Sequence, residues 1–66
     1  MTTYKLYANT NPLNKSEMVC VLNSDSLMST NDKEKLEWVK NRYAEVQMKG
    51  YRCEIWKETK ERVKVL

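Results

Sequence analysis

Residues 31–50, NDKEKLEWVKNRYAEVQMKG, are the one long segment of this chain with a helical pattern, and they limit what the rest can form. Asn31 followed by Glu34 fits a helix-capping box, with Thr30 as the alternative cap, and Gly50 is typical of a helix end. At about 100° per residue, the apolar side chains of the segment fall in a single stripe, formed by Leu36, Val39, Tyr43 and Val46. A helix with one apolar stripe needs an apolar surface to pack against, so the remaining residues have to supply it.

Short strands are expected to supply that surface. Residues 3–8, TYKLYA, alternate apolar and polar side chains, which predicts a half-buried strand. Residues 17–23, EMVCVLN, are a continuous apolar run and predict a second strand, antiparallel to the first. Residues 51–56 alternate again, and residues 62–66 repeat the pattern beyond a polar connection, which predicts a C-terminal hairpin. We therefore predict one α+β domain over the whole chain, with ββαββ order, an antiparallel sheet of about four strands and the helix on one face.

Two connecting segments carry less regular patterns. The residues after the first strand are rich in Asn, Ser and Thr and contain Pro12, the single proline, which predicts a turn. Between the second strand and the helix, residues 23–31 are polar apart from Leu27 and Met28. They form either one serine-capped helical turn or a loop whose two apolar residues cover an end of the core.

The alternation of side chains divides the predicted sheet into two faces. The residues predicted to face the helix are Tyr4, Leu6, Cys20, Cys53, Ile55, Val63 and Val65. The residues predicted on the outer face are Lys5, Tyr7, Val19, Val21, Arg52, Trp56, Arg62 and Lys64. Because one helix covers only two or three strands on one side, the outer face is the main surface whose chemistry needs an explanation.

The outer face combines aromatic, valine and basic side chains, and it has two interpretations. In the first, this face or an exposed edge of the sheet joins a second copy or another protein, which hides Trp56, Val19 and Val21 and adds the core area that a short chain lacks. In the second, Tyr7 and Trp56 stack on unpaired bases while the basic residues neutralise phosphates. Glu54, Glu58 and Glu61 alternate with the basic residues and indicate cross-strand charge pairing, so protein association ranks first.

Two further candidate residues, Trp38 and Arg42, lie on the flank of the predicted helix. Trp38 either covers the edge of the core with its ring under Arg42, or it is an aromatic anchor for a partner protein. With the outer face included, the predicted partner-binding residues are Tyr7, Trp38, Arg42, Arg52, Trp56, Arg62 and Lys64.

Composition argues against several function classes. Twelve Lys and Arg against nine Asp and Glu give a net charge of +3, which is ordinary for a small domain. The chain has no histidine and one glycine, so the commonest general base and a glycine-rich phosphate loop are both missing. We predict a protein that is not an enzyme and has no cofactor. No apolar run approaches the roughly 20 residues of a membrane span, and the N-terminus lacks a signal-peptide pattern, so a cytoplasmic protein without membrane contact is expected.

The two cysteines, Cys20 and Cys53, have no CxxC spacing, and without histidine in the chain no metal site is expected. In a reducing compartment they are predicted to be buried thiols. A disulfide between them is the alternative, if their strands are neighbours.

The junction of helix and strand, KGYRCEIWKE, resembles a pattern common in small open reading frames of phages and prophages of low-GC Gram-positive bacteria, and the Lys- and Asn-rich composition is similar. The resemblance covers residues 36–58 and transfers no site residue to this chain. It implies a small accessory protein that binds a host protein, including defence systems, and inhibits or redirects it. We predict such a phage-type protein, acting as a homodimer in the host cytoplasm. A small nucleic-acid-binding protein is the alternative.

Overall fold

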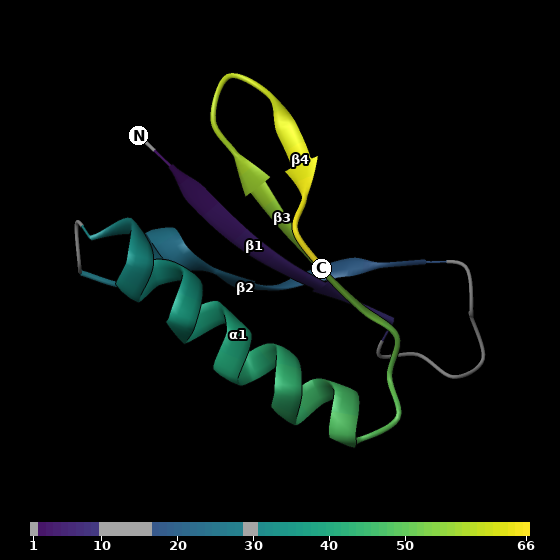
Figure 1. The fold of residues 1–66 in the computed structure, drawn as a ribbon. Coiled ribbons are helices and arrows are strands. Elements are labelled where there is room, and N and C mark those ends of the chain that lie inside the picture. The colour runs from purple at the N-terminus through teal and green to yellow at the C-terminus, as the bar shows by residue number, and fades with distance from the viewer. Residues whose placement is uncertain (1, 10–16, 29–30) are drawn as a thin grey trace.

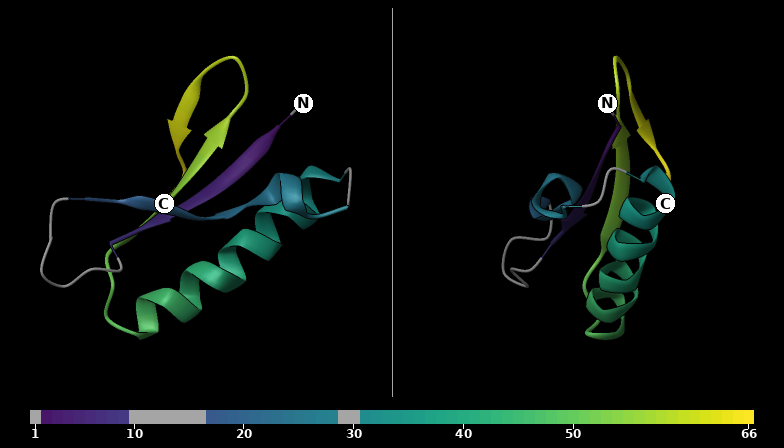
Figure 2. Two further views of the ribbon diagram at one scale, coloured as in Figure 1. Left: turned by 180° about the vertical axis from the view of Figure 1, so that it is seen from behind. Right: turned by 90° about the vertical axis from the view of Figure 1, so that its left-hand side faces the viewer.

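The computed structural model describes residues 2–9, 17–28 and 31–66. Its elements, in chain order, are β1 (Thr3–Ala8), β2 (Val19–Asn23), the 3-10 helix η1 (Ser24–Ser26), α1 (Asp32–Met48), β3 (Cys53–Glu58) and β4 (Arg62–Lys64) (Figure 1). The four strands form one antiparallel sheet in the order β2-β1-β3-β4. The helix packs on one face of this sheet, as the two views in Figure 2 show. The predicted α+β fold of ββαββ order is confirmed, with η1 as an additional turn.

The predicted strand pairings are also confirmed, with small differences in the strand ends. β1 has the predicted bounds and pairs antiparallel with β2, and β3 forms the predicted C-terminal hairpin with β4. β2 begins at Val19 instead of residue 17, and β3 begins at Cys53 instead of residue 51. β1 and β3 lie side by side at the centre of the sheet. The predicted turn at Pro12 lies outside the described residues.

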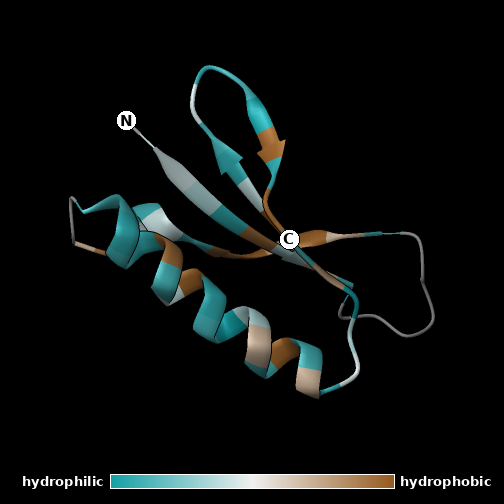
Figure 3. Ribbon diagram, viewed as in Figure 1, coloured by the Kyte–Doolittle hydropathy of each residue, from teal (hydrophilic) through white to brown (hydrophobic). Residues whose placement is uncertain are grey.

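The core lies between α1 and the two central strands. Its largest fully buried apolar side chains are Leu6, Ile55 and Val39, one from each of β1, β3 and α1, and Tyr4, Ala8 and Cys53 complete it. The other members of the predicted helical stripe are partly buried against this core and are Leu36, Tyr43 and Val46. The helical stripe therefore faces the sheet as predicted. In Figure 3 apolar residues are also visible along β2.

Both ends of α1 have the capping chemistry that the sequence indicates. The side-chain oxygen of Asn31 accepts a hydrogen bond of 2.9 Å from the backbone N–H of Lys33. At the other end the backbone N–H of Gly50 donates to the carbonyl of Gln47, and Gly50 has a φ of +89°. Glycine takes this left-handed conformation without a steric cost from a Cβ atom. Thr30, the alternative cap, lies outside the described residues.

The segment between β2 and α1 forms the helical turn, the first of the two predicted alternatives. Asn23, and not a serine, caps it by accepting a 2.9 Å hydrogen bond from the backbone N–H of Asp25. Ser24 is fully buried, and its hydroxyl accepts a 2.8 Å hydrogen bond from the backbone N–H of Tyr4. Met28 is 98% exposed, so the prediction that it covers an end of the core is wrong. The turn therefore ties the start of β1 to the end of β2.

The division of the sheet into two faces needs one correction, in β2. The register pairs Leu6 with Leu22 but Tyr7 with Cys20, so one residue of β2, Val21, is inserted as a bulge. An inserted residue reverses the alternation of the strand beyond it. Cys20, predicted to face the helix, instead lies opposite Tyr7 on the outer face and is exposed. Val19, predicted on the outer face, lies opposite Ala8 on the helix side.

A second correction concerns β4. Val63 lies opposite Lys57, on the helix side of the sheet as predicted, but it is 52% exposed. The helix packs mainly against β1 and β3 and does not reach this edge. Val65, beyond the end of β4, packs against the core as predicted, and its backbone N–H donates to the carbonyl of Ile55 at 2.8 Å.

Candidate functional site

Among the described residues, aromatic, basic and acidic side chains gather on the side of the sheet that faces away from α1. We call this surface the outer face and define it by the register of β1, β3 and β4, in which cross-strand partners share a face. Its members are Thr3, Lys5, Tyr7, Glu54, Trp56, Glu58, Arg62 and Lys64. Three are cations and two are carboxylates, so the face carries a small positive excess of 3 − 2 = 1.

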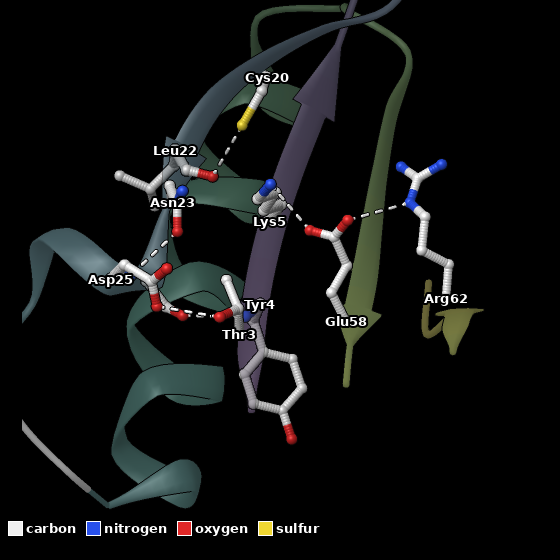
Figure 4. A network of polar contacts seen from close by, with 10 residues as sticks. Thr3, Tyr4, Lys5, Cys20, Leu22, Asn23, Asp25, Glu58 and Arg62 are labelled. Carbon is white, nitrogen blue, oxygen red and sulfur yellow. Dashed lines mark hydrogen bonds and ion pairs between the residues drawn. The ribbon is translucent and has the colours of Figure 1, made fainter. Parts of the chain in front are cut away.

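Glu58 connects the three strands of the outer face. Lys5 of β1 approaches one carboxylate oxygen of Glu58 at 2.9 Å, and the Nε atom of Arg62 approaches the other at 3.3 Å (Figure 4). The hydrogen bond to Glu58, followed by its charge, raises the pKa of Lys5 above its ordinary value. Because both oxygens of Glu58 are engaged, this carboxylate holds the two cations at fixed positions.

Glu54 makes a second set of contacts on the same face. The indole Nε1 of Trp56 donates to one of its oxygens at 3.2 Å, and the ammonium of Lys64 lies 3.4 Å from the other. The hydrogen bond from Trp56 lowers the pKa of Glu54, and the contact with Lys64 and the charge of Arg52 add to this effect. The indole ring is therefore fixed at its polar edge.

Arg62, on the edge strand β4, extends its side chain over the aromatic rings of the outer face. Its guanidinium carbon is 4.6 Å from the ring centroid of Trp56 and 5.3 Å from that of Tyr7, which is the geometry of a cation–π contact with both rings. Its Nε atom faces Glu58, while its two terminal nitrogens point away from Glu58 (Figure 4). Among the described residues these terminal nitrogens have no hydrogen-bond acceptor, and the side chain is 51% exposed. The result is an oriented, half-exposed guanidinium whose two terminal nitrogens point away from its carboxylate partner.

The structure brings together four of the predicted partner-binding residues, Tyr7, Trp56, Arg62 and Lys64. Arg52 precedes β3 and is exposed, and it is linked to this group only through its charge effect on Glu54.

The two predicted residues of the helix lie elsewhere. Trp38 is half-buried and packs against the core, which supports the interpretation that it covers the core edge. Arg42 is exposed and forms an ion pair of 3.0 Å with Glu45. Neither residue belongs to the outer face.

Sequence reasoning foresaw the charge pairing in general but missed particular members. The alternation of glutamates with basic residues predicted cross-strand pairs, and Glu54 and Glu58 form them. Lys5 was also predicted on this face, but no partner was predicted for it. The alternation of β1 places Lys5 on the same face as Glu54 and Glu58, and this was the available signal for an ion pair. The bond from the hydroxyl of Thr3 to Asp25, at 2.9 Å, carried no signal in the sequence.

The two cysteines lie on opposite faces of the sheet and are both free thiols. The alternative of a disulfide between Cys20 and Cys53 is therefore wrong. Cys53 is buried, as predicted, and burial raises the pKa of its thiol. Within residues 2–9, 17–28 and 31–66, there is no group of three or more metal-ligating side chains. Over the same residues, no helix is long and apolar enough to cross a membrane.

Comparisons with protein-family models, with curated proteins and with solved structures gave no match for this chain. Its function therefore has to be argued from the chemistry of its own surface.

Proposed function

We propose that this chain is a non-enzymatic accessory protein that binds and modulates another protein through its outer face. The observation that carries the proposal is the position of Arg62 over Tyr7 and Trp56, with its side chain half exposed and its terminal nitrogens directed away from Glu58. Trp, Tyr and Arg are the residue types that contribute most to binding energy in protein interfaces. A guanidinium held at its Nε atom and stacked on two rings is well suited to a bidentate contact with a partner carboxylate.

The side chains around Arg62 also resemble those of a protein interface in their charge and polarity. Glu54 and Glu58 compensate the charges of Lys5, Lys64 and Arg62, so the rim is polar and nearly neutral. Interfaces commonly combine an aromatic centre with such a polar rim. Because the side chains are already fixed by ion pairs and ring contacts, binding would cost little conformational entropy.

The alternative, binding of single-stranded nucleic acid, is less favoured by this geometry. Stacking of a base needs an uncovered aromatic face, and Arg62 already lies over both Tyr7 and Trp56. Binding along a nucleic-acid backbone needs several unpaired cations, whereas the three cations of the outer face are paired with glutamates and only the terminal nitrogens of Arg62 have no acceptor among the described residues.

The class of partner follows from the resemblance of the helix–strand junction to phage open reading frames. A host protein with an exposed acidic group is the partner that this resemblance and the geometry of Arg62 together favour. We place the binding function on the outer face and not on the flank of α1, because Arg42 is paired with Glu45 and Trp38 covers the core.

The proposal is tested by affinity capture with the tagged chain and with three variants. Arg62→Ala and Trp56→Ala remove the two partners of the cation–π contact, and Arg42→Ala removes a similarly exposed arginine from the helix. Circular dichroism first establishes that each variant is folded. We expect one defined host protein to be retained by the wild type and by Arg42→Ala and lost by both outer-face variants.

Two results would overturn the proposal. One is capture that all three variants retain equally. The other is retention of the wild type on single-stranded DNA or RNA that weakens steeply with salt and disappears in Arg62→Ala and Trp56→Ala, since that is the behaviour of a phosphate-binding surface.

A further inference from the structure

The sheet has one edge that differs sharply from the other. Among the described strands, β2 has a single hydrogen-bonded neighbour, β1, so its other side is an open edge. Its first three residues, Val19, Cys20 and Val21, are all exposed, and the two valines are 48% and 40% exposed. Apolar side chains along an open strand edge form a template for pairing with another strand.

The opposite edge, β4, carries the features that prevent such pairing. It is only three residues long, and two of them, Arg62 and Lys64, are cations with more than half of their side chains exposed. A second copy placed against β4 would bring like charges opposite each other, which is unfavourable. β2, by contrast, contains no charged residue and no proline.

We propose that β2 pairs with β2 of a second copy of this chain, antiparallel and around a two-fold axis, so that the two sheets become one sheet of eight strands. The second copy is the occupant that fits, because two antiparallel copies of β2 meet without like charges and bring the exposed valines of both chains into one contact. Such a contact uses the same surface on both copies and closes at two, whereas a contact between unlike edges would propagate. The contact also covers Val19 and Val21, which the small core of one copy leaves exposed.

This pairing has a consequence for the outer face. The two-fold axis between antiparallel strands is perpendicular to the sheet, so both outer faces lie on the same side of the dimer. The dimer then presents two Arg62 clusters, each formed by Arg62, Tyr7 and Trp56, to one partner surface. The dimer itself does not depend on the proposed binding function, since β2 contributes no residue to the Arg62 cluster.

The bulge at Val21 limits the length of the seam. An inserted residue interrupts the regular alternation of β2. The seam, by which we mean the contact between the two β2 strands, is therefore limited to the exposed residues up to the bulge, which are Val19, Cys20 and Val21. A seam of this length is expected to give a reversible dimer whose population rises with protein concentration.

Cys20 provides a reporter at the centre of this seam. Strands in a sheet are about 4.8 Å apart and residues about 3.4 Å apart along a strand, so a shift of up to two residues keeps two Cys20 residues within about 9 Å of each other. A short bismaleimide should therefore yield a covalent dimer on a denaturing gel. Cys20→Ser should yield none, because Cys53 is buried.

The interface is located by a matched pair of variants. Val21→Lys places like charges across the proposed seam, whereas Val63→Lys makes the same change at an exposed valine of the other edge strand. In sedimentation over a concentration series, the wild type and Val63→Lys should shift from one chain mass to two, and Val21→Lys should stay at one. Val19→Lys serves as a second seam variant if Val21→Lys does not fold.

Three outcomes would overturn the inference. The first is a wild-type mass that stays near 7.9 kDa at every concentration without a Cys20 crosslink. The second is a dimer that both seam variants retain. The third is a sedimenting mass that rises beyond two chains with concentration, because that would indicate contact between unlike edges and not a closed pair.

Discussion

At the scale of single residues, the two cysteines have opposite environments. Cys20 is exposed on the outer face, while Cys53 is buried and the pKa of its thiol is raised by burial. Since the thiolate is the reactive form, a brief pulse of a maleimide reagent should label Cys20 and leave Cys53 unlabelled until the chain is unfolded. Mass spectrometry of the digested protein measures this directly. Equal labelling of both cysteines under native conditions would contradict the placement of Cys53 in the core.

Glu54 should make the stability of the fold depend on pH. The hydrogen bond from Trp56 lowers the pKa of Glu54 below its ordinary value of 4.5. A lowered pKa means that the unfolded chain takes up this proton more readily, so the contribution of Glu54 is present above that value and is lost as the pH falls. Glu54→Gln keeps an acceptor for Trp56 but cannot titrate. Its free energy of unfolding should therefore fall less than that of the wild type between about pH 6 and about pH 3.

Urea unfolding followed by circular dichroism at several pH values measures this difference. Glu61→Gln is the matched control, because the side chain of Glu61 forms no ion pair among the described residues, and its pH dependence should be closer to that of the wild type. If Glu54→Gln and the wild type lost stability in parallel, the contact with Trp56 would have no energetic role.

How far single residues could be predicted depended on how local their environment is. Alternation within strands, which a sequence displays directly, places Glu54 and Glu58 on one face with basic residues, while their particular partners depend on the register of the strands. The hydrogen bond from the ammonium of Lys35 to the carbonyl of Thr2, at 3.2 Å, joins the helix to the first residues of the chain. A lysine buried by such a contact looks, in the sequence, like any other lysine on a helix.

At the scale of elements, η1 is the connection whose energetic role can be tested most sharply. The hydroxyl of Ser24 is the acceptor for the buried N–H of Tyr4 at 2.8 Å. Ser24→Ala leaves that N–H without its partner, which should lower the free energy of unfolding by about 1–3 kcal/mol. Ser26→Ala, in the same turn but exposed, should change it by less than about 0.5 kcal/mol. Urea unfolding of both variants decides the matter, and equal losses would mean that the bond to Tyr4 is unimportant.

The helix and the strands differ in how well their sequence predicted them. The ends of α1 follow from Asn31 and Gly50, whose side-chain and backbone chemistry acts within one turn. β2 was predicted as a strand, but its bulge was not. A bulge depends on how one strand pairs with its neighbour, so no pattern within β2 itself indicates that Val21 is inserted or that Cys20 faces outward.

At the scale of the whole molecule, the two faces of the sheet have separate roles. The apolar stripe of α1 and the alternation of the strands predicted which face is covered, and this established the fold. The sequence could not indicate how far the helix reaches across the sheet, because that depends on the direction of the helix axis. Val63 shows the effect, since it lies on the helix side but beyond the helix.

The separation of the two faces predicts that two neighbouring residues of β1 affect different properties when changed to alanine, one the stability of the fold and the other the binding of a partner. Leu6 is fully buried at the centre of the core, and Leu6→Ala should lower the free energy of unfolding by about 2–5 kcal/mol. A chain of 66 residues has about 3–10 kcal/mol in total, so a large part of this variant should be unfolded at 37 °C, where native stability is already reduced. Tyr7 lies on the outer face under Arg62, and Tyr7→Ala should stay folded while losing the partner contact proposed for that face.

Thermal unfolding by circular dichroism and the capture experiment, applied to both variants, test this separation. Leu6→Ala should fail in both, because an unfolded chain has no outer face to present. Tyr7→Ala should melt cooperatively, close to the wild type, and fail only in capture. If Tyr7→Ala unfolded as readily as Leu6→Ala, the ring contact with Arg62 would be a structural requirement of the sheet. The outer face would then contribute to the stability of the fold, and loss of capture by its alanine variants would report unfolding and not loss of a partner contact.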